Sequence, residues 1–85
     1  MAEDPKHPVL NVTILTPERL VYQGKAESVI LPGEQGVFEI LPHHKTILSR
    51  LLKGRVVVDR KVLKIRRGVV KAGMNDVTLI VEEAA

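Results

Sequence analysis

Short apolar runs separated by turn residues make up most of this chain. In residues 10–15 apolar side chains alternate with polar ones and β-branched residues are frequent, which is typical of a half-buried strand. The same criteria, with Gly or Pro at the boundaries, predict strands over residues 20–22, 26–31 and 37–41.

Two pairs of apolar runs in the second half have hairpin spacing. Residues 55–58 and 62–65 are separated by only three residues, which predicts a tight connection. Residues 68–72 and 77–81 flank a segment that contains Gly, Asn and Asp, the residues that best tolerate the backbone angles of a tight turn. We therefore expect two hairpins.

Residues 44–53 have a different periodicity. Ile47, Leu48, Leu51 and Leu52 recur at the three-to-four spacing of an amphipathic helix, and a glycine follows the segment where a helix would end. The pattern alone predicts a helix here. We keep this helix as an alternative to a strand.

The other segments predict an all-β fold: a small antiparallel β-sandwich or flattened barrel of about eight to ten short strands. With 85 residues, 45% of them hydrophobic, the chain has room for one small domain. We place it over residues 9–82, after a flexible polar N-terminus (1–8) and before a short tail (83–85). No run approaches the ~20 apolar residues of a membrane span, and the polar start does not resemble a signal peptide.

Charge is distributed unevenly. Residues 50–71 carry a net charge of +8, and the rest of the chain carries −5. The basic segment suits nucleic acid, anionic lipid or an acidic protein, although solvent-facing strand positions are also often Lys or Arg. A basic β-barrel that binds nucleic acid is therefore the alternative function. The scarcity of aromatic residues argues against it, because Tyr22 and Phe38 alone could stack on bases.

Residues capable of chemistry do not gather into a recognisable motif. Without cysteine, a metal site would depend on Glu39, His43 and His44, but adjacent strand residues point to opposite faces. Ser28 and Ser49 lack the strand-to-helix turn of a serine nucleophile. We expect no catalytic residue, metal site or cofactor. A small hydrolase or isomerase, the third hypothesis, would require a pocket with converging titratable groups.

Three separate motifs carry a family resemblance: residues 16–24, residues 31–44, and Gly68 together with residues 75–79. Over about residues 9–82 they resemble the N-terminal β-sandwich domain of the epsilon subunit of rotary F-type ATP synthases, called delta in mitochondria. The central motif has the family's Leu-Pro-Gly turn, its Ile-Leu-Pro and its histidine, here His44. Glu39 departs from the pattern, because many members have glycine there. The family fold implies that residues 46–52 are extended, against their periodicity, and we follow the family for this segment.

Two other departures concern positions next to these motifs. Lys45-Thr46 stands where Ala-Pro is common, and Arg67-Gly68 replaces a frequent Gly-Gly. Longer members of the family continue into a C-terminal helical hairpin, whose start corresponds to residues 81–85.

The resemblance implies a non-catalytic rotor part of a proton- or sodium-translocating ATP synthase. Such a part binds the gamma subunit, rests on the ring of membrane c subunits, and uses no cofactor, small-molecule substrate or nucleic acid. It is peripheral to the membrane, for which we expect the cytoplasmic face of the bacterial inner membrane. The expected partner interface consists of Glu34, Gln35, Gly36, Glu39, Pro42, His43 and His44. Two separate adhesive surfaces are needed, and the loop over residues 33–39 and the turn over residues 42–44 are the candidates for the ring and gamma contacts.

Overall fold

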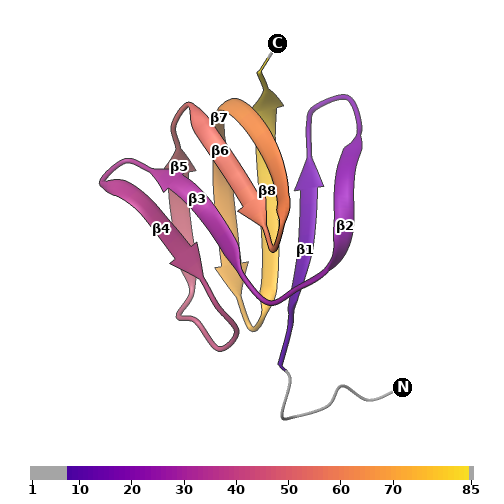
Figure 1. The fold of residues 1–85 in the computed structure, drawn as a ribbon, viewed down its shortest axis with the longest axis vertical. Coiled ribbons are helices and arrows are strands. Elements are labelled where there is room, and N and C mark those ends of the chain that lie inside the picture. The colour runs from indigo at the N-terminus through magenta and orange to yellow at the C-terminus, as the bar shows by residue number, and fades with distance from the viewer. Residues whose placement is uncertain (1–7, 85) are drawn as a thin grey trace.

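The computed structural model describes residues 8–84, which form strands in two packed layers (Figure 1). The strands are β1 (Leu10–Leu15), β2 (Leu20–Ala26), β3 (Val29–Gly33), β4 (Gly36–Ile40), β5 (Ile47–Leu51), β6 (Gly54–Val58), β7 (Lys61–Gly73) and β8 (Asp76–Glu83). No helix occurs between residues 8 and 84, so the predicted all-β class is confirmed. The predicted polar N-terminus lies outside the described residues except for Pro8.

One continuous sheet folds over itself to make both layers. Its strand order is β2-β1-β8-β7-β5-β3-β4, and β6 pairs with both β3 and β7. The first layer contains β2, β1, β8, the C-terminal half of β7, and β5; the second contains β4, β3, β6 and the N-terminal half of β7. Every pair is antiparallel except β1 with β8, which is parallel. The predicted antiparallel sandwich is thus confirmed with one parallel pair.

β7 corrects one boundary, because the two strands expected over residues 62–65 and 68–72 are a single strand of 13 residues. Its pairing with β8 shifts between Ile65 and Arg67, so Arg66 is an extra residue in a β-bulge. A bulge bends a strand and reverses which face its following side chains take. The strand can therefore pass from one layer to the other with apolar side chains facing inward on both sides of the bend.

β5 shows that the segment over residues 44–53 contains a strand. The helix that periodicity predicts is therefore wrong, and the extended conformation implied by the family resemblance is confirmed. Leu51 is buried, whereas Leu48 is 79% exposed and Leu52 is 47% exposed. The spacing was misleading because these two leucines lie on the outer surface and do not belong to a helical apolar face.

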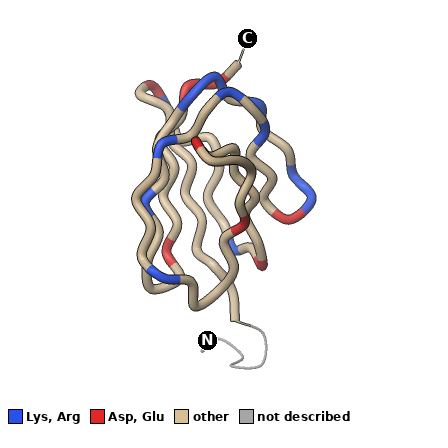
Figure 2. Tube along the Cα trace, turned by 90° about the vertical axis from the view of Figure 1, so that its left-hand side faces the viewer, with Lys and Arg blue, Asp and Glu red and all other residues tan. Residues whose placement is uncertain are grey.

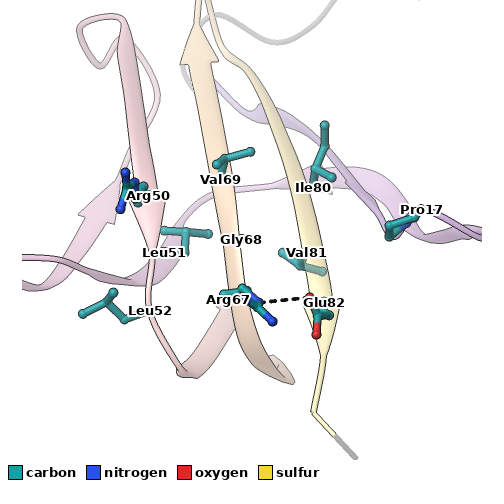
Figure 3. A pocket seen from close by; sticks show the side chains of 10 residues that line it. All are labelled: Pro17, Arg50, Leu51, Leu52, Arg67, Gly68, Val69, Ile80, Val81 and Glu82. Carbon is teal, nitrogen blue, oxygen red and sulfur yellow. Dashed lines mark hydrogen bonds and ion pairs between the residues drawn. The ribbon is translucent and has the colours of Figure 1, made fainter.

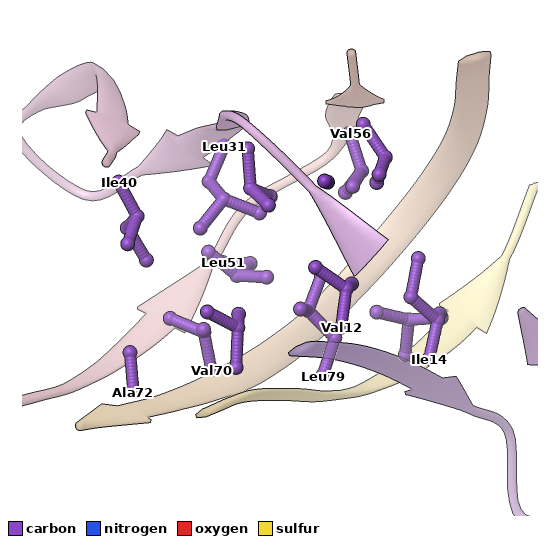
Figure 4. Packing of buried hydrophobic residues seen from close by; sticks show 14 of the residues in the cluster. Val12, Ile14, Leu31, Ile40, Leu51, Val56, Val70, Ala72 and Leu79 are labelled. Atoms are coloured by element: carbon purple, nitrogen blue, oxygen red, sulfur yellow. The ribbon is translucent and has the colours of Figure 1, made fainter. Parts of the chain in front are cut away.

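The core lies between the layers and is aliphatic. In Figure 4, Leu31 and Ile40 of the second layer lie toward Leu51, Val70 and Leu79 of the first. All five are at most 2% exposed, and no described polar or charged residue is buried. The two aromatic residues, Tyr22 and Phe38, are partly buried and pack against the same cluster. The space between the layers is therefore filled by side chains, and residues 8–84 place no converging titratable groups in it.

Candidate partner interface

The expected interface residues at positions 34–36 form a two-residue hairpin turn between β3 and β4. Gly33 pairs with Gly36, and Glu34 and Gln35 occupy the exposed tip. Gly36 has a φ of 117°, a backbone angle that only glycine adopts without strain. The turn thus presents a carboxylate and an amide on a short, fixed loop.

Glu39 lies further along β4, on the outer surface of the second layer. It pairs with Ile30 of β3 and is exposed. The family's frequent glycine at this position is therefore replaced without crowding the core, because the Glu39 side chain points to solvent.

The expected interface residues at positions 42–44 form a second turn, between β4 and β5. His43 has a φ of 68°, and its backbone N–H donates to Asn75 Oδ1 at 2.6 Å. The His44 N–H donates to Leu41 O at 3.2 Å, and its ring Nδ1 lies 2.9 Å from Lys45 O. Both imidazoles are exposed, while the backbone of this turn is fixed to the turn between β7 and β8.

The two turns lie at opposite ends of β4. A strand of five residues is about 16 Å long, so the 34–36 turn and the 42–44 turn do not form one contiguous site. The two turns are therefore two separate surfaces of the domain.

A third surface was missed by the sequence reasoning. Leu15 pairs with both Leu20 and Ile80, Ile80 pairs with Val69, and Val69 pairs with Arg50. We call Leu20, Leu15, Ile80 and Val69 the apolar row; it crosses four strands on the outer face of the first layer. Leu20 is 50%, Ile80 49% and Val69 41% exposed.

The apolar row borders a shallow groove, shown in Figure 3. Pro17 and Leu52 add apolar lining at either side. Along the same face, Arg67 Nε donates to Glu82 Oε2 at 3.0 Å, and both side chains are partly exposed. An apolar strip with a charged rim is the usual composition of a protein interface.

The close approach of two strands gives this groove its floor. A Cβ at Gly68 would lie 2.7 Å from Ile80 O and 2.9 Å from Val81 Cγ1. Only glycine permits β7 and β8 to lie this close at the bend. This explains why the second glycine of the family's frequent Gly-Gly is present here as Gly68 although the first is replaced by Arg67.

Lys and Arg gather beside the end of the molecule where β8 finishes (Figure 2). Arg19 Nη2 contacts Glu83 Oε1 at 2.8 Å, and Arg66 Nη1 lies 3.6 Å from Glu82 Oε1. Arg55 pairs in register with Lys64 across β6 and β7, with both side chains exposed. The basic segment is thus partly neutralised by β8, but not at the Arg55–Lys64 pair.

Within residues 8–84, no three His, Cys, Asp or Glu side chains are placed to hold a metal ion. The same part of the chain has no helix that is long and apolar enough to cross a membrane.

The family comparison decides what kind of domain this is. The family of the β-sandwich domain of the ATP synthase delta/epsilon chain matches residues 9–85. The chain belongs to this family. The resemblance seen in the sequence is thereby confirmed, and the delta/epsilon chain is a subunit of the synthase distinct from its catalytic subunit.

Curated relatives are named ATP synthase epsilon chain. The one from Nitratiruptor is 38% identical over an alignment of 80 positions, and the match covers 88% of this chain and 62% of that protein. The one from Leptospira interrogans serovar copenhageni is 31% identical over 80 residues, covering 89% of this chain and 63% of that protein. The chain therefore spans less than two thirds of the length of these relatives.

Two solved structures show the same fold. A chain in the central stalk and c ring of Tetrahymena thermophila mitochondrial ATP synthase has a TM-score of 0.72 at 16% identity, covering 87% of this chain and 63% of that chain. A chain in the Euglena gracilis mitochondrial ATP synthase, in a structure of OSCP, F1 and c ring, has a TM-score of 0.80 at 17% identity, covering 91% and 52%.

Proposed function

We propose that this chain is the β-sandwich of a non-catalytic rotor subunit in an F-type ATP synthase. It binds the gamma subunit, rests on the c ring, and helps to couple ion flow to ATP synthesis. The observation that carries the proposal is the exposed apolar row on the outer face of a domain that belongs to the delta/epsilon family.

The apolar row is the surface we assign to gamma. A stable rotor contact must bury apolar area, and the row offers four side chains in register across four strands. Leu48 extends the apolar surface on β5, the strand that follows the 42–44 turn. We therefore place His43 and His44 at the border of the gamma contact.

The 34–36 turn is the surface we assign to the c ring. Glu34 and Gln35 are exposed at the tip of a short hairpin, so they offer polar groups in a fixed orientation. Such groups can contact the polar loops of a c ring. Charge complementarity in such a contact sets the orientation of the two partners more than their affinity. Its distance from the 42–44 turn supports two partners at two surfaces.

The sandwich itself suits the transmission of torque. Its core is closely filled with aliphatic side chains, and packed interiors of this kind deform little under load. Because the two curated relatives named above are bacterial, we propose that the domain is peripheral to the membrane, at the cytoplasmic face of the inner membrane.

The test compares two valines of β7 in a binding assay with purified gamma. Val69→Glu places a carboxylate in the apolar row, whereas Val62→Glu places one on the outer face of the second layer; the residues are 41% and 57% exposed. We expect Val69→Glu to abolish co-purification with gamma and Val62→Glu to preserve it. Equal binding of gamma by both variants would refute the assignment of the row. Failure of the unmodified chain to join gamma and the c ring would refute the function.

A further inference from the structure

The outer face of the second layer carries a pattern that the proposed function does not use. Glu39, Ile30, Val57 and Val62 are paired in sequence across β4, β3, β6 and β7, which makes a second row on the side opposite the apolar row. The Arg55–Lys64 pair lies next to it on β6 and β7. We call these six residues the second-layer face.

The aliphatic part of this face breaks the usual alternation of a sandwich. Outward positions are normally polar, as Thr13, Thr78 and Lys71 are on the part of the first layer beside the apolar row. Here Val57 and Val62 pair directly with each other, and Ile30 pairs with Val57. Val62 is 57% exposed. Ile30 and Val57 are half-buried beside it, and this aliphatic cluster, which reaches the surface at Val62, is suited to a contact made by another molecule.

The charged part of the face determines the chemistry of that molecule. Arg55 and Lys64 are directly opposite each other on antiparallel strands, an arrangement in which like charges repel. Neither forms an ion pair with any residue between 8 and 84. An incoming carboxylate would lie between two cations and relieve their repulsion.

We propose that the second-layer face docks an acidic protein segment, with aliphatic side chains over Ile30, Val57 and Val62 and carboxylates at Arg55 and Lys64. A membrane fits this face less well, because Glu39 at the other end of the row would face anionic headgroups. The aromatic residues that anchor proteins at a lipid interface are also absent from it, since Tyr22 and Phe38 both pack against the core. The same absence leaves nucleic-acid bases without a stacking partner.

The first experiment selects peptides from a random phage-displayed library on the full chain, with Lys71→Glu as the control because Lys71 is exposed on the first layer. We expect selected peptides to be rich in Asp, Glu and aliphatic residues. Their affinity, measured by fluorescence anisotropy of synthetic copies, should fall about tenfold or more for Arg55→Glu/Lys64→Glu and remain unchanged for Lys71→Glu.

A charge exchange makes the test decisive. A copy of the selected peptide with Lys in place of its acids should bind the Arg55→Glu/Lys64→Glu variant and not the unmodified chain. Val62→Ser should weaken binding of the original peptide without lowering the midpoint of thermal unfolding of the chain. Peptides without an excess of acids, or binding that ignores both charge reversals, would overturn the proposal.

Two further probes identify a different occupant. The first probe is sedimentation of the chain with phosphatidylglycerol vesicles, and the second is binding of single-stranded DNA at low salt. If the chain binds either probe and Arg55→Glu/Lys64→Glu abolishes that binding, the occupant is lipid or nucleic acid and the proposal of an acidic protein segment is overturned. We expect the chain to bind neither probe and to select acidic peptides.

Discussion

Val62 and Val69 lie on the same strand and yet face opposite sides of the molecule. Val62 pairs with Val57 on the outside of the second layer, and Val69 pairs with Ile80 on the outside of the first. The bulge at Arg66 makes this possible, because the strand bends there from one layer into the other. β7 therefore supplies a residue to each of the two apolar surfaces.

The buried end of β4 should be sensitive to loss of side-chain volume. Ile40 is completely buried, so Ile40→Ala should lower the free energy of unfolding by about 2 to 5 kcal/mol through lost burial and a cavity. Val37→Ala on the same strand, where the side chain is 74% exposed, should change it by less than about 0.5 kcal/mol. Urea denaturation measures both values. Equal destabilisation would mean that the surface of β4 is as constrained as the core.

The approach of β7 to β8 should make Gly68 intolerant of a side chain. Gly68→Ala would place Cβ within 2.7 Å of a backbone oxygen of β8, which cannot withdraw as a side chain can. We expect a loss of about 1 to 3 kcal/mol in the free energy of unfolding.

The matched control for that substitution is Gly24→Ala on β2. Its new Cβ would meet only the Tyr22 side chain, at 3.0 Å from the hydroxyl oxygen. This change should alter stability by less than about 1 kcal/mol in either direction. If Gly68→Ala proves as mild as the control, the strands can separate at the bend.

The Asn75 side chain should hold the 42–44 turn in place. Asn75→Gly keeps a residue that tolerates the φ of 65° but removes the acceptor of the His43 N–H. Hydrogen exchange at the His43 amide should become faster, and stability should fall by about 0.5 to 1.5 kcal/mol.

Asn75→Ala separates the backbone effect from the hydrogen bond. It removes the same acceptor and adds about 1 kcal/mol of strain from the left-handed backbone angle. Unchanged exchange at His43 in both variants would show that the turn is held by other contacts, such as the bond from the His44 N–H to Leu41 O.

The assignment of the 34–36 turn predicts a selective defect in assembly. Glu34→Arg reverses a charge at an exposed tip, so it should weaken retention of the chain on a reconstituted gamma and c ring complex without changing binding to gamma alone. Glu27→Arg makes the same charge change at another exposed position and should have no effect. Comparable loss in both variants would indicate an effect of net charge alone.

Sequence reasoning predicted most strands because their turns have a local cause. The hairpin between β7 and β8 is an example: Met74 and Asn75 have φ values of 50° and 65°, as tight hairpin turns require. It divided β7 in two because no local signal distinguishes a bulge at Arg66 from a break. It could not identify β5 by periodicity, since exposed Leu48 and Leu52 are indistinguishable in sequence from core leucines.

The surfaces were harder to predict than the fold. Leu15, Val69 and Ile80 are far apart in the chain and meet only through the pairing of β1, β8 and β7. Their separation in sequence concealed the apolar row. The 34–36 and 42–44 turns, in contrast, are close in sequence, and the length of β4 holds them apart.

The parallel pairing of β1 with β8 affects the order in which this protein can fold during its synthesis. β8 lies between β1 and β7, so the first and last strands are neighbours at the centre of the first layer. During synthesis, β1 and β2 lack this connection to the rest of the sheet until β8 has left the ribosome. Productive folding then depends on long-range closure, which is slower than closure of local hairpins and leaves the emerging aliphatic strands exposed to chaperones meanwhile.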